Sequence, residues 1–568
     1  MNAIGIDFGT TNSVVAAQTS SGVEVLAIDT APKDWQPYGF DNVLPSVMAR
    51  DENSRLSFGW EAKQSSVGRF DAVKRMFATQ LDFAVDDAGD ALAVEEVATM
   101  LFAELRRRTI LAGFAADQAV ITVPANSKGR ARHRTKLCAG MAGLEVLALI
   151  NEPTAAAMAY AQRHPESRQL LVFDWGGGTL DVTVLQSVDG IFIEQASSGI
   201  PRLGGIDFDS RLEKIVRDSI PGLENLNPAE RHALRLEVEL AKIRLSTSDA
   251  TSIQLPDGKA FRVTRSRFEQ EIAPLLEESR IPLESCLREL QIGPGSIDAL
   301  VLVGGTCRVP AVRKFVQDLL RADADPDINP MTAIAEGAAI AAGILTGQNT
   351  SSDFFVCLEH ALGTFTLDRE SGGQSFSTVI RKGTKLPARS SGNFFPVVPT
   401  TESVTVEVVE GDPDSLRPDY TVLKSWDVPL KMPYTEGSSR SFDLEYHYDV
   451  DGIILVTATD EESGDVIFQG DVAYGIATNK RELKQMSDRA KAAVNEGIVS
   501  AEATVKLQDP EATKLIEQAR VKVIPFLDST EATPITTAVE ALEKSAGTDS
   551  GALKAELKKL LAPFSFLF

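Results

Sequence analysis

The chain of 568 residues has few cysteines and no long apolar run. Its cysteines lie far apart and form no Cys-x-x-Cys pair, which argues against a structural zinc site and favours a reducing compartment. No stretch approaches the ~18 consecutive apolar residues of a membrane-spanning helix. The first residues lack a basic segment and reach an acid at Asp7, which is not typical of a signal peptide. The sequence therefore predicts a cytoplasmic location.

Positive charge is also scarce. The chain has 57 Lys and Arg against 80 Asp and Glu, a formal net charge of −23. Nucleic-acid binding needs a basic surface and anionic membranes attract basic segments, so we expect neither nucleic acid nor a membrane as partner. The hydrophobic content of 43% and the charged content of 24% are ordinary for globular chains and exclude wholesale disorder.

Short β-branched runs alternate with longer helical patterns over the first 347 residues. This alternation predicts an α/β architecture. The predicted strands are Ala3–Asp7, Val120–Val123, Leu170–Phe173, Val182–Leu185 and Ala299–Val303. The predicted helices are Glu95–Leu111, Asp207–Val216, Ala229–Leu245 and Arg267–Leu290.

The pattern changes after a polar segment near residue 350. Between about 360 and 477 apolar and polar residues alternate with a period of two, as at Val404, Val406 and Val408, which predicts strands. A turn is predicted at 449–452, between strands at Phe442–Tyr448 and Ile453–Ala458. Helical spacing follows from about 478. We therefore divide the chain into a first domain (1–347), a linker (348–358), a β domain (359–477) and a helical segment (478–568).

Three glycine-containing turns follow apolar strands: 7–13, 174–181 and 303–310. The first two share one design, a strand that ends in an acid and a turn with Gly and Thr, so their backbone N–H groups can point at phosphate oxygens. Their similarity indicates a duplication, with two α/β halves that face each other across a nucleotide cleft. The Walker-A and Rossmann patterns are both missing. Each turn, taken alone, also fits an ordinary hairpin or βα loop.

These three loops, in this order, resemble those of the superfamily of actin, sugar kinases and heat-shock ATPases. Residues 149–160, LINEPTAAAMAY, resemble the first hinge helix of the seventy-kilodalton heat-shock (DnaK-like) chaperones. Further stretches that resemble this family are 173–181, 203–209, 239–246 and 336–339. The resemblance covers at least residues 1–477. It implies an actin-like duplicated ATPase domain, a β-sandwich peptide-binding domain and a helical lid.

The resemblance also implies roles for single residues. Lys74 matches the lysine that positions the γ-phosphate and the attacking water, Glu152 matches an acid near that water, and Asp174 and Thr179 complete the catalytic set. Asp7 and Asp174 match the acids that hold hydrated Mg²⁺. The implied ATP/ADP-binding residues are Gly9, Thr10, Thr11, Asn12, Gly176, Gly177, Gly178, Gly204, Gly205, Glu239, Lys242, Ser246, Gly304, Gly305, Thr306 and Arg308. K⁺ is a candidate further cation, and Pro124 and Arg132 match an interdomain relay.

These assignments have plainer alternatives in the residues themselves. Lys74 lies beside Arg75 in a segment that could be a solvated helix face. Glu152 could be only an acid favoured by the dipole of a helix N-terminus. In the β domain the residues that match a peptide pocket are Thr366, Leu367, Phe394, Val397, Val404 and Val406. Val404 and Val406 alternate like any core strand of a sandwich.

Departures from the family pattern concern partners. Ala148 and Leu149 stand where the family has an arginine that helps to dock J-domain cochaperones, so ordinary J-protein use is doubtful. A nucleotide-exchange factor stays among the expected partners. The helical segment is shorter than the usual lid, and the acidic terminus of eukaryotic cytosolic members is missing, which favours a divergent bacterial-type member.

Charge refines the expected clients. Residues 349–478 have 9 basic and 21 acidic residues and so carry more than half of the net charge of −23. We therefore expect clients with extended apolar segments flanked by Lys or Arg. The leading hypothesis is an ATP-hydrolysing chaperone that binds and releases unfolded peptides. The alternatives are a nucleotide-switched assembly or regulatory factor with restricted clients, and an actin-like filament or sugar kinase, against which the β domain argues.

Overall fold

The computed structural model forms two compact units. Unit 1 comprises residues 1–125, 138–352 and 484–568, and unit 2 comprises residues 126–137 and 353–483. The structure describes residues 2–79, 81–86, 90–125, 127, 129–188, 191–200, 203–349, 358, 360–368, 372–385, 387–396, 402–411, 413, 420–430, 441–448, 454–472, 480–500, 509–524, 527, 529–545 and 550–567.

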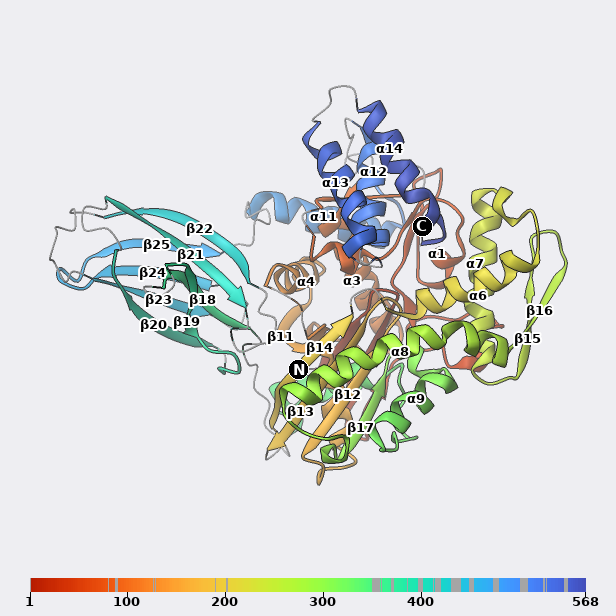
Figure 1. Cartoon of the computed structure of the whole chain (residues 1–568), viewed down its shortest axis with the longest axis horizontal. Coiled ribbons are helices and arrows are strands. Elements are labelled where there is room, and N and C mark those ends of the chain that lie inside the picture. Colours follow the sequence, from red (N-terminus) through yellow and green to blue (C-terminus); the bar gives the residue numbers. More distant parts are fainter. Residues whose placement is uncertain are drawn as a thin grey trace. The chain divides into compact units, whose positions relative to one another are not determined.

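The first sheet of unit 1 is built around β1 (Ala3–Phe8). β1 pairs in parallel with β10 (Gln118–Val123) and forms an antiparallel hairpin with β2 (Asn12–Thr19). β11 (Glu145–Asn151) and β3 (Gly22–Val25) complete the order β11-β10-β1-β2-β3, and β4 (Leu44–Pro45) pairs with β2. The strands of this sheet are drawn in red to orange in Figure 1, with β11 in orange.

The second sheet repeats this design around β12 (Gln169–Trp175). β12 forms an antiparallel hairpin with β13 (Leu180–Val188) and pairs in parallel with β17 (Ala299–Val303), in the order β14-β13-β12-β17 with β14 at Ile191–Ile200. The pairs Phe8–Ser13 and Trp175–Leu180 close the two hairpins around loops of equal length. The shared pairing order fits the predicted duplication.

Two small-residue helices lie beside the first sheet. α5 (Glu152–Ala161) and α10 (Ala333–Leu345) pack against each other, and α10 also packs on β1. A Cβ atom on Gly337 would lie 1.7 Å from the carbonyl oxygen of Ala155, and one on Gly5 would lie 2.1 Å from the nitrogen of Ala339. The close approach therefore needs glycine at both positions, and it fixes Glu152 at the start of α5 near the strand ends.

The remaining helices of this region begin and end within a few residues of the predicted limits. They are α3 (Val94–Leu111), α6 (Gly205–Ser219), α7 (Pro228–Leu245) and α8 (Arg265–Glu289). Shorter elements are α1 (Trp60–Gln64), α2 (Val73–Met76), α4 (Gly129–Met141), α9 (Pro310–Leu320), β5 (Met48–Arg50), β6 (Leu56–Phe58), β7 (Arg69–Phe70), β8 (Phe83–Val85), β9 (Ala91–Ala93), β15 (Ala250–Gln254) and β16 (Ala260–Thr264). Trp175, Phe208 and Phe268 are fully buried in the core under the second sheet.

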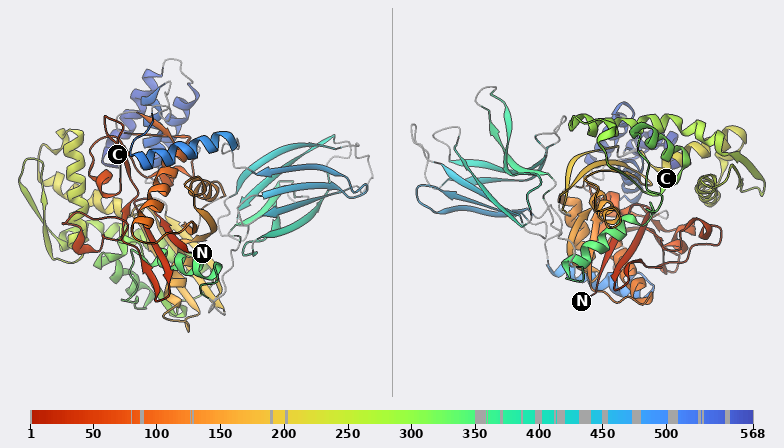
Figure 2. Two further views of the ribbon diagram at one scale, coloured as in Figure 1. Left: turned by 180° about the vertical axis from the view of Figure 1, so that it is seen from behind. Right: turned by 90° about the horizontal axis from the view of Figure 1, so that it is seen from below.

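Unit 2 is a β-sandwich. One sheet has the order β19-β18-β21-β22 and the other β20-β23-β24-β25, and all pairings are antiparallel; Figure 2 shows these strands from two further sides. Apolar residues from both sheets share one core. The strands are β18 (Ala361–Leu367), β19 (Gln374–Ile380), β20 (Ala388–Phe394), β21 (Ser403–Gly411), β22 (Thr421–Pro429), β23 (Phe442–Tyr448), β24 (Ile454–Asp460) and β25 (Val466–Val472). The predicted turn at 449–452 lies outside the described residues.

The C-terminal segment is helical, as the spacing predicts. It comprises α11 (Lys480–Glu496), α12 (Pro510–Glu517), a π-helical turn η5 (Gln518–Val523), α13 (Ser529–Lys544), α14 (Gly551–Leu561) and η7 (Ala562–Leu567). From Lys484 onward it belongs to unit 1. The role of these helices as a lid for the sandwich stays a prediction from the sequence. Among the described helices, none is long and apolar enough to cross a membrane.

Candidate nucleotide site

A lysine and a glutamate from distant parts of the chain meet in unit 1. Lys74 lies on α2, which follows Ala72 in the left-handed region at φ +54°, and Glu152 is the first residue of α5. The Lys74 Nζ atom lies 2.6 Å from Glu152 Oε1, and the two side chains are only 10% and 12% exposed. Lys74 is therefore not on a solvated helix face. A shielded pair of this kind can orient a water molecule next to a phosphate.

Three aspartates at strand ends lie around this pair. Asp7 is the penultimate residue of β1 and accepts a hydrogen bond from Thr122 Oγ1 at 3.2 Å, and Asp174 and Asp181 stand opposite each other on β12 and β13. Burial, with the negative charge of Glu152, raises the pKa of Asp7 to about 7 and that of Asp181 to about 7. The same causes raise the pKa of Asp174 well above its ordinary value, and Lys74 opposes the shift. Four crowded carboxyl groups make this a place where a cation is favourable.

The carboxylates fit a hydrated cation better than a directly ligated one. Among the described residues no group of three or more His, Cys, Asp and Glu side chains is arranged to hold a metal ion. Mg²⁺ usually keeps several waters and binds through one or two carboxylates together with substrate phosphates. The arrangement of Asp7 and Asp174 is compatible with that mode.

The two glycine-containing loops face each other. A Cβ atom on Gly177 would lie 2.3 Å from Thr11 Oγ1, which joins the second loop to the first. A Cβ atom on Gly178 would lie 1.6 Å from Arg75 Nη2, so the guanidinium group rests on this glycine. The loops therefore lie close enough to contact one phosphate chain from both sides, as their sequence design predicts.

The second loop is held by the start of α6 and by the third loop. The N–H groups of Gly205 and Ile206 donate to the carbonyl oxygens of Gly176 and Gly177 at 3.0 and 2.8 Å. Thr306 Oγ1 donates to the Gly176 carbonyl at 2.8 Å. Gly304 has φ +83°, and a Cβ atom there would lie 2.3 Å from the Trp175 carbonyl oxygen, so only glycine fits.

The residues expected around the adenosine form ion pairs. Glu239 on α7 pairs with Lys63 at 2.8 Å, and Lys242, one turn further on, pairs with Asp209 at 2.8 Å. Ser246 caps the end of the same helix. Arg308, which the resemblance places among the nucleotide-binding residues, donates from Nη1 to the Tyr38 carbonyl. The sequence did not single out Lys63 or Asp209, which only the folded chain brings to Glu239 and Lys242.

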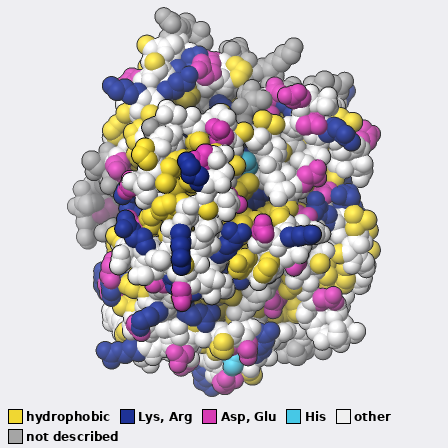
Figure 3. All heavy atoms as spheres, turned by 90° about the vertical axis from the view of Figure 1, so that its right-hand side faces the viewer, with side chains coloured by type: hydrophobic (Ala, Val, Ile, Leu, Met, Phe, Trp, Pro, Cys, Tyr) yellow, Lys and Arg dark blue, Asp and Glu magenta, His cyan; other side chains and the backbone are white. Residues whose placement is uncertain are grey.

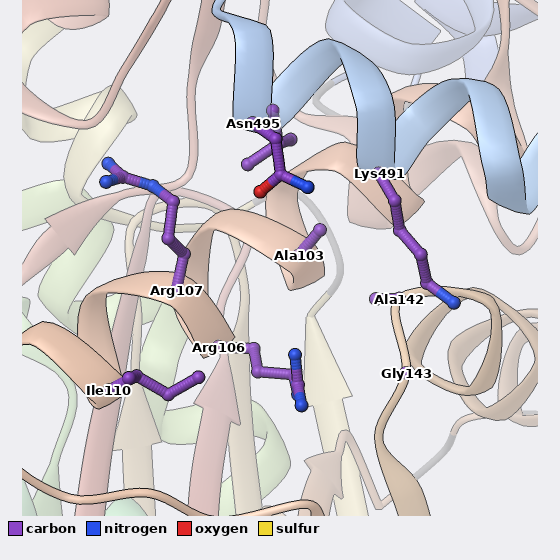
Figure 4. Close-up of a pocket in the computed structure, with 9 residues that line it drawn as sticks. Ala103, Arg106, Arg107, Ile110, Ala142, Gly143, Lys491 and Asn495 are labelled. Atoms are coloured by element: carbon purple, nitrogen blue, oxygen red, sulfur yellow. The ribbon is translucent and has the colours of Figure 1, made fainter.

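A cavity of about 240 Å³ lies among these groups. It is lined by Thr10 and Thr11 of the first loop, by Lys63, Asp209 and Glu239, and by residues of α12 and η5. A second cavity, of about 330 Å³, lies between α3 and α11, where Figure 4 shows Arg106, Arg107 and Lys491 around it. Its arginines pair with Asp117 and Glu104, and no predicted nucleotide residue lines it. The first cavity, lined by two residues of the first phosphate loop and by Glu239, therefore adjoins the candidate nucleotide site.

One face of the molecule mixes charges of both signs. Figure 3 shows a face on which Lys and Arg side chains are spread across the middle, with acidic and hydrophobic side chains between them. Charges of both signs are therefore mixed on this face, although the whole chain is acidic.

The structure describes all but one of the residues predicted for the interdomain relay and the peptide pocket. Pro124 belongs to unit 1 and Arg132 to unit 2. Leu367, at the end of β18, is exposed, whereas Val406 is buried in the sandwich core. Phe394 and Val404 are partly buried against the same core, and Phe394 stacks on Phe442. Thr366 lies next to Leu367 on β18, and Val397 lies outside the described residues.

Comparison with known proteins gives consistent matches. The family model described as "Hsp70 protein" matches residues 72–565. A chaperone protein DnaK of Thermotoga neapolitana is 32% identical over 510 residues, which cover 86% of this chain and 83% of the relative. Chaperone proteins dnaK of Cyanophora paradoxa and Cyanidioschyzon merolae are each 32% identical, and their alignments cover 81% of this chain and 78% and 80% of the relatives. The chain belongs to the Hsp70 family of ATP-dependent chaperones, whose members are ATPases.

Proposed function

We propose that this chain hydrolyses ATP in the cleft of unit 1 and couples hydrolysis to the binding and release of extended apolar peptide segments by the sandwich of unit 2. The observation that carries the ATPase assignment is the buried Lys74–Glu152 pair, 2.6 Å between charged atoms, beside two facing phosphate loops. Nothing in the comparisons favours the alternative of a nucleotide-switched assembly or regulatory factor.

Positioning and charge neutralisation are the chemistry that this site supplies. Thr10, Thr11 and the N–H groups of the second loop would hold the phosphate chain. Lys74 and Glu152 would keep the attacking water in line with the γ-phosphorus, and the lysine would compensate charge that develops on the phosphoryl oxygens. Bound Mg²⁺, held through water by Asp7 and Asp174, would neutralise phosphate charge. K⁺ stays a candidate further cation.

Single-turnover ATP hydrolysis by Lys74→Ala tests this mechanism. Loss of one preorganised cationic donor should slow the chemical step by about 10²–10³-fold, with a much smaller change in nucleotide affinity. Lys314→Ala is the matched control, because Lys314 is 76% exposed and, among the described residues, pairs only with Asp318 on its own helix. Hydrolysis at the wild-type rate by Lys74→Ala would refute the assigned roles.

Coupling to peptide binding needs a separate measurement. The affinity of a labelled apolar peptide, followed by fluorescence anisotropy, should be lower with ATP than with ADP, because the two nucleotide states favour different domain states. Equal affinities would exclude the coupled cycle and leave a plain ATPase with a separate peptide-binding module.

The acidic balance of residues 349–478 gives a finer proposal about clients. Peptides with Lys or Arg beside the apolar segment should bind more tightly than peptides with Asp or Glu there, and the difference should shrink at high salt. A peptide series that differs only in these flanking residues would decide this. The absence of any preference would remove charge from the account of client choice.

The remaining partners and the location are also proposals. Ala148 and Leu149 lead us to expect weak stimulation by J-domain proteins, which an ATPase assay with added J-domain would measure. A nucleotide-exchange factor is expected to act on the same cleft. A cytoplasmic location stays a prediction from the sequence.

A further inference from the structure

The last helices of the chain form a small helical body of their own. α12, η5, α13 and α14 share an apolar core whose members include Leu515, Val523, Ile535, Val539 and Leu557. An ion-pair network supports it, since Lys554 bridges Asp509 and Glu511 at 2.9 and 3.1 Å. We call the described residues between 509 and 567 the C-terminal cap. These shared contacts make the cap one body, whose helices we expect to move together.

The cap is attached to the segment that carries the catalytic lysine. Glu517 Oε2 accepts a hydrogen bond from the Val85 N–H at 2.7 Å, and Lys514 Nζ donates to the Asp86 carbonyl at 2.9 Å. Lys522 Nζ lies 2.7 Å from Asp71 Oδ1, and these two side chains are 20% and 31% exposed. Asp71 is three residues before Lys74, so the cap holds the approach to α2.

A second link joins the cap to a phosphate loop. Arg75, the neighbour of Lys74, donates from Nη1 to the Val521 carbonyl of η5 at 3.3 Å. The same guanidinium group rests on Gly178 of the second loop. One side chain thus contacts both the cap and a glycine that is expected to touch phosphate. A displacement of η5 at Val521 would therefore shift Arg75 and, through it, the loop at Gly178.

The cap also lines the nucleotide cavity and contacts the second half of the ATPase region. Lys514, Gln518 and Lys522 line the cavity of about 240 Å³ together with Thr10, Thr11 and, from the second half of the ATPase region, Asp209 and Arg235. The final turn η7 lies beside α6, whose start holds the second loop. The cap therefore contacts both halves that must separate for a nucleotide to leave.

We propose that the C-terminal cap closes the nucleotide cleft and slows nucleotide release, with the Lys522–Asp71 ion pair and the Arg75–Val521 hydrogen bond as its attachment. This inference rests on the proposed function, because it takes the cavity to be the ATP site. When the cap is seated, opening of the cleft requires these contacts to break. Displacement of the cap then speeds exchange without any change in the catalytic residues.

Release of a fluorescent ADP analogue, measured by stopped flow on the full chain, tests the proposal. Lys522→Glu places an acid against Asp71 and should speed release about tenfold, since loss and reversal of a half-buried pair corresponds to roughly one decade. Lys522→Arg keeps the charge and should stay within about twofold of wild type. Lys544→Glu is the matched control, because Lys544 lies on α13 of the same cap, is 81% exposed and, within the part of the chain that the structure describes, pairs with Glu540 alone.

A second variant and a second readout guard against a misfolded protein. Lys514→Glu acts at the separate contact with Asp86 and should also speed release. Hydrogen exchange of residues 510–523 should rise in both variants, while the sheets of unit 1 stay protected. Release rates in Lys522→Glu and Lys514→Glu equal to that of Lys544→Glu would refute the proposal that the cap slows nucleotide release. Failure of the wild-type chain to bind the analogue at all would overturn the proposed function instead.

Discussion

Substitution of Gly204 by alanine isolates the steric demand of the second phosphate loop. Gly204 precedes α6 with φ −153°, an extended conformation that any residue adopts, so the change introduces no backbone strain of its own. The added Cβ atom would lie 2.4 Å from the Gly178 nitrogen and 2.5 Å from the Gly177 carbonyl carbon. Both are backbone atoms and cannot rotate away as the end of a side chain does.

The size of the effect follows from these distances. Ordinary van der Waals contact for a Cβ atom begins near 3.4 Å, so the loop must move by about 1 Å away from α6. The hydrogen bonds from Gly205 and Ile206 to the loop carbonyls, at 3.0 and 2.8 Å, would stretch with it. A misplacement of about 1 Å can cost on the order of 10²-fold in rate. The cost in folding stability should be about 1–3 kcal/mol, the usual range for an overpacked site.

Isothermal titration with ADP and single-turnover hydrolysis of ATP would measure the two consequences. Gly295→Ala is the control, because a Cβ atom there meets nothing within 4 Å. Gly205→Ala should lie between them, since its Cβ atom would meet Thr306 Oγ1 at 2.9 Å and Lys242 Nζ at 3.2 Å, both side-chain ends that can shift. Wild-type affinity and rate in Gly204→Ala would refute the role of this contact and of the second loop.

Three further substitutions test other parts of the molecule. Burial raises the pKa of the Glu517 carboxyl to about 7 from 4.5, although Lys522 opposes the shift. The contribution of this carboxyl group to stability is therefore present below about pH 4.5 and is lost as the pH rises through 7. Glu517→Gln should abolish this pH dependence and, at pH 8, stabilise unit 1 by up to ~3 kcal/mol in calorimetry. Tyr446→Phe removes a buried hydroxyl that lies 3.0 Å from the Gly363 carbonyl and should destabilise the sandwich by ~1–2 kcal/mol in denaturant titration, and an unchanged midpoint would contradict this. Gly337→Ala would force a Cβ atom to 1.7 Å from the neighbouring helix and should cost about 3 kcal/mol or more, seen as a lowered Tm.

The sequence predicted best the elements whose signal is local. The strand Ala299–Val303 is found at the predicted residues, and β1 and α3 differ from prediction by one residue at one end. Continuous apolar runs that end in glycine leave little freedom in assignment. The antiparallel strand β14, with the polar residues Glu194 and Gln195 in its middle, was missed because half-exposed strands carry no clear period.

The site was predictable where one motif carries the chemistry and not where side chains meet across the fold. The Gly-Gly-Gly-Thr loop itself indicated a phosphate cradle. Asp181 lies in that motif but was not assigned a role, although its register opposite Asp174 on the hairpin brings it to the same carboxylate cluster. The Lys63–Glu239 pair joins α1 to α7, which no local pattern could show. Tertiary contacts of this kind also decide where the last helices lie.

The seated cap and the bound nucleotide must affect each other equally. If the cap slows release because nucleotide binds more tightly when residues 509–567 contact the cleft, the nucleotide must stabilise those contacts by the same free energy. A tenfold change in affinity corresponds to about 1.4 kcal/mol, and the Lys522–Asp71 pair at 2.7 Å is of a kind that can supply it. Hydrogen exchange of residues 510–523 should therefore slow about tenfold when ADP is saturating, and this slowing should disappear in Lys522→Glu. Exchange that does not respond to ADP would mean that the helices pack on unit 1 without any thermodynamic link to its nucleotide.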